Sequence, residues 1–134
     1  MHLTVQNLIN IKYEIQSKII ELNYKDYKPE IIAVSKTFEI EHICHLINHG
    51  HIHYGENKVQ EAVKKWTDIK SKNNNLILHM VGKLQTNKVK YAINLFDYIH
   101  SVDNLKLAEK ISDEQKKYNK KPKIFIQINI GNEK

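Results

Sequence analysis

The sequence predicts an α/β fold built on a parallel sheet. Five short apolar runs typical of strands alternate with stretches whose apolar residues recur at helical spacing. Parallel neighbours need a crossover connection, which a helix normally supplies. The alternation fits both an open doubly wound sheet and a (β/α)8 barrel. No Gly-x-Gly-x-x-Gly follows the first strand candidate, which weakens the dinucleotide-binding form of the open sheet.

A leading helix is expected over about residues 5–22. Its apolar positions line one helical face: Leu8, Ile11, Ile15 and Ile19. The run 31–34 follows, and its consecutive apolar residues predict a strand covered on both faces. Apolar residues then repeat at helical spacing over 40–47, with Gly50 placed as a C-terminal cap.

The strand–helix unit recurs along the rest of the chain. Strands are predicted at residues 51–54, 76–81, 98–102 and 123–130, and helical stripes at residues 59–69, 89–96 and 105–111. Asp103 or Asn104 is expected to cap the last helix. A chain of 134 residues has the length of one modest domain, so residues 1–134 are expected to form a single domain.

Composition narrows the class of protein. No apolar run approaches the roughly 20 residues of a membrane helix, and no secretory signal opens the chain, so a cytoplasmic protein is expected. A single cysteine, Cys44, fits a reducing compartment. The net charge of +6 is carried by lysine without any arginine, which argues against a sequence-reading nucleic-acid-binding protein.

Polar residues follow the strand candidates and would meet at one edge of the sheet. Lys36 follows the first strand, Asn57 follows the second, and Ser101 lies at the end of the fourth. A lysine at the end of a buried strand suits covalent chemistry with an aldehyde, because partial burial lowers the pKa of its ammonium group. A solvated loop lysine is the competing interpretation.

Three blocks of sequence favour the covalent interpretation. They are Ile-Ala-Val-Ser-Lys-Thr at 32–37, Tyr-Gly-Glu-Asn-Lys-Val-Gln-Glu at 54–61 and His-Met-Val-Gly-Lys-Leu-Gln-Thr-Asn-Lys at 79–88. In this order and spacing they closely resemble the family of pyridoxal 5'-phosphate (PLP) homeostasis proteins, the YggS/PROSC-like vitamin B6-binding proteins. Segments 99–103 and 126–130 are similar to that family's fourth and fifth strand motifs.

The resemblance implies a fold-type III PLP barrel, a (β/α)8 TIM-barrel-like fold related to the N-terminal barrel of alanine racemases. It implies that Lys36 holds PLP as a Schiff base and that Asn57 neighbours the cofactor ring. His79 and Ser101 are expected to line the pocket. It further implies a non-catalytic carrier and regulator of vitamin B6, not an enzyme, and a monomer for the complete family member.

Family members continue well beyond the length of this sequence. The resemblance therefore implies an incomplete barrel domain, with about five of eight strands, that lacks the segments gripping the cofactor phosphate. Five strands cannot close an eight-stranded barrel, so the last strand would present an open edge that provides a route to self-association. Impaired retention of PLP is expected, because a Schiff base alone is reversible in water.

Two other functions stay open at the level of sequence. A fragment of a PLP-dependent racemase or lyase would also use Lys36, but it needs a second acid–base group across the cofactor. A histidine-rich metal-binding domain would use the stripe His42, His45 and His49, for which a solvated helix face is the simpler explanation.

The residues just before the helix at 59–69 have simpler interpretations too. Glu56, Gln60 and Glu61 are expected to stabilise the start of this helix, where negative charge suits the dipole. Asn57 could cap the helix as well as neighbour the cofactor.

Overall fold

The computed structural model describes residues 1–131, which divide into two compact units. The first unit comprises residues 1–31 and 38–52, and the second comprises residues 32–37 and the chain from residue 53 onward. All five strands belong to the second unit, and helices α1 and α2 belong to the first.

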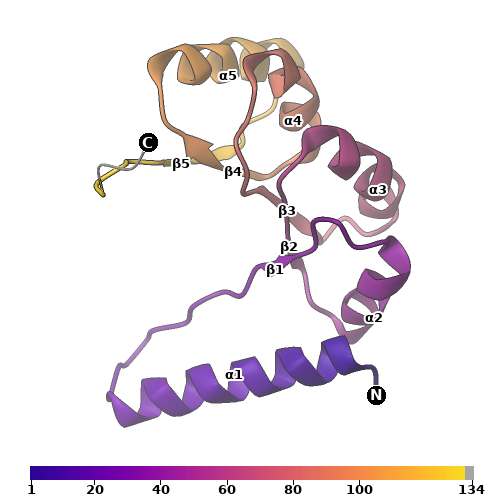
Figure 1. Ribbon diagram of the computed structural model, residues 1–134, viewed down its shortest axis with the longest axis vertical. Helices are drawn as coiled ribbons and strands as arrows, with labels where there is room; N and C mark the ends of the chain where they lie inside the picture. The colour runs from indigo at the N-terminus through magenta and orange to yellow at the C-terminus, as the bar shows by residue number, and fades with distance from the viewer. Residues whose placement is uncertain (132–134) are drawn as a thin grey trace. The chain divides into compact units, whose positions relative to one another are not determined.

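The first unit consists of α1 (Leu3–Glu21), α2 (Ile40–His49) and their connections (Figure 1). α1 occupies the range expected for the leading helix and buries Val5 and Leu8. α2 ends at Gly50, whose φ of 100° is the left-handed conformation of a C-terminal cap. The cap predicted at this glycine is thus confirmed.

The second unit is a five-stranded parallel sheet. Its strands are β1 (Ala33–Val34), β2 (His53–Glu56), β3 (Ile77–Met80), β4 (Tyr98–Val102) and β5 (Lys123–Ile126). They lie side by side in sequence order, each parallel to the next. In a doubly wound sheet the strand order reverses at one point, so that not every strand lies beside the next one in sequence. The consecutive order observed here is that of a barrel. The α/β prediction is confirmed, and the sheet corresponds to part of a (β/α)8 barrel.

The first and last strands are shorter than the sequence predicted. The run 31–34 pairs only at Ala33 and Val34, and the run 123–130 pairs only over 123–126. Within the described residues each of these strands has one partner, so no second neighbour holds the flanking residues in the ladder. An irregularity between Ile99 and Val102 also interrupts the pairing of β4 with β5.

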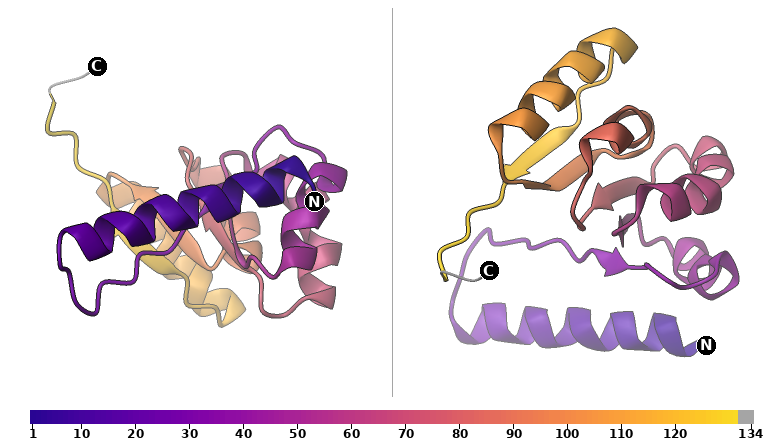
Figure 2. Two further views of the ribbon diagram at one scale, coloured as in Figure 1. Left: turned by 90° about the horizontal axis from the view of Figure 1, so that it is seen from below. Right: turned by 45° about the horizontal axis from the view of Figure 1, so that its top comes forward.

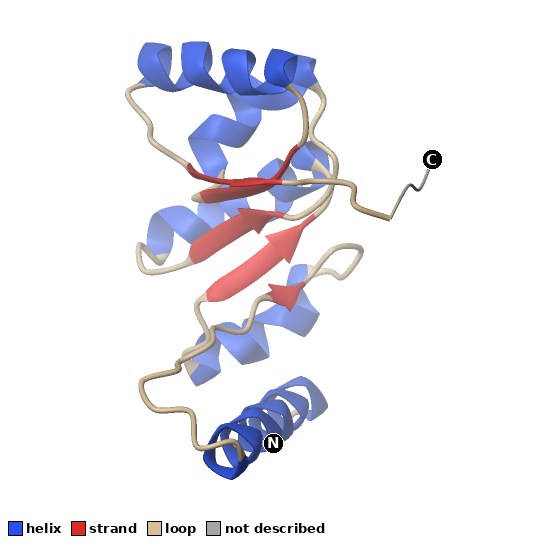
Figure 3. Cartoon of the chain, turned by 90° about the vertical axis from the view of Figure 1, so that its left-hand side faces the viewer, coloured by secondary structure: helices blue, strands red, loops and turns tan. Residues whose placement is uncertain are grey.

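Three helices cover one face of this sheet, as Figure 3 shows and as the right-hand view of Figure 2 shows from another side. They are α3 (Val59–Lys72), α4 (Val89–Leu95), which follows the short 3-10 helix η1 (Thr86–Lys88), and α5 (Leu105–Tyr118). Asn104 caps α5, because its side-chain oxygen accepts a hydrogen bond from the Leu107 N–H at 2.9 Å. This cap was predicted.

The core of the second unit lies between the sheet and these helices. Its largest fully buried side chains are Trp66, Tyr54, Leu78, Met80, Ile99, Leu107, Glu56 and Val89. The rings of Tyr54 and Trp66 lie 4.9 Å apart, which places Tyr54 on the helix-covered face of β2. Successive strand residues point to opposite faces, so Glu56 shares that face, whereas His53 and Gly55 point to the other.

Candidate functional site

Lys36 lies two residues beyond the end of β1, at the carboxyl-terminal edge of the sheet. The next residue, Thr37, has a φ of 67°, an unusual left-handed conformation for a β-branched residue. The Lys36 side chain is exposed, so the shielding predicted for it is wrong for this structure. The physical reason is that β1 has only two residues and that its last residue, Val34, is itself 50% exposed.

The main chain on both sides of Lys36 is tied to α3. The ammonium group of Lys65 donates a hydrogen bond to the Ser35 carbonyl oxygen at 2.8 Å. The carboxylate of Glu61 accepts one from the Thr37 N–H at 2.7 Å. The Lys36 backbone is therefore anchored at the residue before it and at the residue after it, while its side chain projects freely.

Glu56 is fully buried beneath this turn. One of its oxygens, Oε1, accepts hydrogen bonds from Lys65 Nζ at 2.7 Å, from Trp66 Nε1 at 2.8 Å and from Ser35 Oγ at 3.1 Å. The helix-start role predicted for Glu56 is wrong, because this last residue of β2 points into the layer between sheet and helices. Glu61 does lie in the first turn of α3, as predicted.

Asn57 follows β2 directly. The cap role considered for it is wrong, because Lys58 occupies the N-cap position of α3 and no side chain bonds there. The Asn57 Oδ1 atom is buried and has no hydrogen-bond partner in the described part of the chain. Gly82, beyond β3, packs directly on the Asn57 backbone, which therefore lies where a side chain at residue 82 would otherwise be.

Ser101 is buried at the end of β4. Its hydroxyl donates a hydrogen bond of 2.6 Å to the carbonyl oxygen of Gly82. The structure therefore brings two of the four predicted site residues together through Gly82: Asn57 packs on one side of the glycine and Ser101 bonds to it.

His79 is the second-last residue of β3 and is 4% exposed. Its Nε2 is 3.0 Å from His53 Nδ1, and its Nδ1 is 2.9 Å from His100 Nε2, so three histidines form a ladder across β2, β3 and β4. Desolvation, followed by the charges of His100 and His53, lowers the pKa of His79 from 6.5 to about 4. His79 is therefore neutral near pH 7, with both ring nitrogens engaged by neighbours.

The sequence interpretation missed the anchoring set formed by Ser35, Glu56, Glu61, Lys65 and Trp66, and it missed the partners of His79. A weak signal existed for the ladder, since His53, His79 and His100 fall in three successive strand candidates. Nothing in the sequence indicated that Lys65, nine residues after Glu56, reaches back to it.

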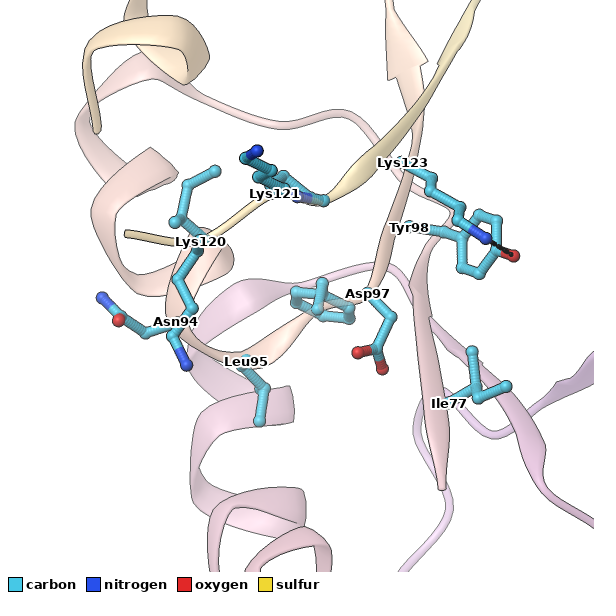
Figure 4. Close-up of a pocket in the computed structure, with 11 residues that line it drawn as sticks. Ile77, Asn94, Leu95, Asp97, Tyr98, Lys120, Lys121 and Lys123 are labelled. Atoms are coloured by element: carbon cyan, nitrogen blue, oxygen red, sulfur yellow. Dashed lines mark hydrogen bonds between the residues drawn. The ribbon is translucent and has the colours of Figure 1, made fainter. Parts of the chain in front are cut away.

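Two hollows flank the sheet. A cleft of about 620 Å³ lies at the same edge as Lys36, and its lining includes Asn57, Gly82 and Lys83. Figure 4 shows a smaller hollow of about 330 Å³ at the opposite edge, lined in part by Asp97 and Tyr98. Barrel proteins carry their binding sites at the carboxyl-terminal edge of the strands, so the edge that bears Lys36 is the candidate site.

No group of three or more histidine, cysteine, aspartate or glutamate residues within 1–131 is arranged to hold a metal ion. None of the helices described has the length and apolar character needed to cross a membrane.

Comparison with known proteins gives a consistent family. The pyridoxal phosphate homeostasis protein of Pasteurella multocida is 35% identical over 128 residues, which cover 96% of this chain and 55% of that protein. The protein of the same name from Haemophilus influenzae is 37% identical over 128 residues, which cover 95% of this chain and 54% of that protein. No family model matches the sequence.

A solved structure agrees with these relatives. PipY of Synechococcus elongatus PCC7942, with PLP bound, superposes with a TM-score of 0.74 at 32% identity, over 87% of this chain and 55% of that one. The chain spans about half the length of the curated relatives it matches. By sequence and by fold, this chain is similar to the pyridoxal phosphate homeostasis proteins over about half of their length.

Proposed function

We propose that this chain binds PLP through a Schiff base on Lys36, as part of a vitamin B6 homeostasis protein. The observation that carries the proposal is the state of Lys36: its main chain is anchored on both sides and its amine is exposed at the carboxyl-terminal edge of a parallel sheet. The name of the relatives and the PLP bound to PipY support PLP as the aldehyde that reacts with Lys36.

The neighbouring residues fit a cofactor of this kind. PLP supplies an aldehyde that condenses with a primary amine, and Lys36 offers one. Asn57 has a buried oxygen whose hydrogen-bonding capacity is unused in the described part of the chain, so it can accept a hydrogen bond from a bound group. Because Gly82 lacks a side chain, the Asn57 backbone lies close against the end of β3.

His79 and Ser101 complete the proposed pocket by supporting it. Ser101 holds the Gly82 carbonyl, and through Gly82 it fixes the position of Asn57. His79 is neutral near pH 7 and hydrogen-bonded through both ring nitrogens, so it supplies neither a charge nor a free base.

The proposed role is that of a carrier and not that of an enzyme. A racemase or lyase needs a second acid–base group near the cofactor. The one histidine among the proposed site residues, His79, is already engaged on both sides by His53 and His100. We expect the PLP-loaded chain to leave L-alanine unchanged, as measured by chiral chromatography after prolonged incubation, and formation of D-alanine would favour the enzymatic alternative.

Titration of the chain with PLP, followed by visible absorbance, tests the proposal. A Schiff base absorbs differently from the free aldehyde, so binding is read directly. The expected result is a saturable band that Lys36→Ala removes and that Lys106→Ala preserves, because Lys106 is an exposed lysine on α5. Equal bands from all three proteins would mean that PLP condenses with surface lysines without selection, and the proposal would be wrong.

A further inference from the structure

We infer that Lys65 and Glu61, on α3, are positioning residues for Lys36. Neither residue belongs to the proposed pocket, and the sequence indicated neither of them as a contact of residues 35–37. They hold the main chain of residues 35–37 in the conformation that presents the Lys36 amine. This inference rests on the proposed function only for its consequence at the cofactor.

The first support is the geometry of the hydrogen bonds. Lys65 Nζ donates to the Ser35 carbonyl oxygen at 2.8 Å, and Glu61 Oε1 accepts from the Thr37 N–H at 2.7 Å. These are the main-chain groups that flank Lys36. Hydrogen bonds in which one partner is charged are stronger than neutral ones, and each of these two has a charged partner.

The second support is the burial of the anchor. The Lys65 side chain is 9% exposed and the Glu56 side chain is 0% exposed, with 2.7 Å between their charged atoms. Long charged side chains are almost never this buried unless they are paired. The Lys65 ammonium group is therefore fixed in place, and its hydrogen bond to the Ser35 carbonyl oxygen fixes that group as well.

The third support is the backbone conformation that the anchor maintains. Thr37 has a φ of 67°, a left-handed region that β-branched residues avoid. A strained residue persists where surrounding contacts determine its conformation. The hydrogen bond from the Thr37 N–H to Glu61 is such a contact. Without it the turn would relax, and the main chain of Lys36 would no longer be held in one position.

Removal of the two contacts one at a time tests the inference. Glu61→Ala removes the acceptor for Thr37, and Lys65→Met removes the donor to Ser35. Lys64→Met is the matched control, since Lys64 is the exposed neighbour of Lys65 on the same helix. Glu61→Ala removes only a partly exposed side chain, so it keeps the test decisive if Lys65→Met, which leaves Glu56 unpaired, fails to fold.

Two readouts separate this inference from the proposed function. Amide hydrogen exchange at Thr37 is measured without the cofactor. We expect it to accelerate at least about tenfold in Glu61→Ala and in Lys65→Met, because a tenfold change corresponds to the loss of a hydrogen bond with a net contribution of about 1.4 kcal/mol. Circular dichroism in the visible band of bound PLP reports whether the cofactor is held in one orientation. We expect this signal to fall in both variants and to persist in Lys64→Met.

The outcomes are distinct. If Thr37 exchanges at the wild-type rate in folded variants, or if the exchange changes while the dichroism of bound PLP stays the same, the positioning role is overturned. If the wild-type chain forms no Lys36-dependent band with PLP, the proposed function fails, and the exchange rates alone then decide whether Lys65 and Glu61 hold the turn.

Discussion

Gly82 and Asn57 approach each other so closely that a side chain cannot be accommodated at residue 82. A Cβ atom built there would lie 2.5 Å from the Asn57 carbonyl oxygen and 2.6 Å from the Asn57 Cβ. The segments after β2 and β3 thus pack backbone against backbone, and a glycine is needed for this contact and not for an unusual φ.

The alanine variant Gly82→Ala should destabilise the fold. The added methyl group meets backbone atoms, which cannot rotate away as a side chain can, so we expect the free energy of unfolding to fall by about 1–3 kcal/mol. Urea denaturation followed by far-UV circular dichroism measures this change. An unchanged midpoint would show that the two segments separate without cost and that Asn57 is not fixed by this contact.

The hydroxyl of Ser101 should contribute to stability in a measurable way. Ser101→Ala leaves the partly buried Gly82 carbonyl without its 2.6 Å hydrogen bond, and we expect a loss of about 1–2 kcal/mol. The control is Ser71→Ala, because the Ser71 hydroxyl bonds to Asp68 in an exposed part of α3. Equal small effects of both variants in urea denaturation would contradict the bridging role of Ser101.

Acid should weaken the fold through His79. Its folded-state pKa of about 4 lies below the ordinary value of 6.5, so between these values the unfolded chain binds a proton that the folded chain does not. The free energy of unfolding should therefore fall as the pH drops from about 6.5 towards 4, and the cost is absent above 6.5. His100, whose pKa burial also lowers, adds to the effect in the same direction.

Urea midpoints at pH 7 and pH 5 measure this dependence. In His79→Phe the difference between the two midpoints should shrink, whereas in His49→Ala, a substitution of an exposed histidine on α2, it should stay as in the wild type. If His79→Phe retains the full difference, other groups cause the acid sensitivity.

Local sequence patterns predicted much of the fold because they depend on neighbouring residues. The alternation of strands and helices, the cap at Asn104 and the glycine at the end of α2 each follow from a few adjacent positions. The position of Lys36 after the first strand followed in the same way, because a strand end is visible in the apolar pattern.

Contacts between elements were the part that sequence could not supply. The pairing of Glu56 with Lys65 depends on how α3 packs on the sheet, and the ladder through His79 depends on the register of three strands. The exposure of Lys36 follows from the shortness of β1, which is decided by how many residues find a partner in β2.

The identity of the lysine that reacts with PLP tests the central claim most directly. The chain is loaded with PLP, reduced with borohydride, digested and mapped by mass spectrometry, so that each of its 21 lysines is scored for the cofactor label. The account predicts that the label concentrates on the peptide containing Lys36 and disappears from the map in Lys36→Ala. A label spread evenly over surface lysines, or one that persists at another position when Lys36 is replaced, would contradict it.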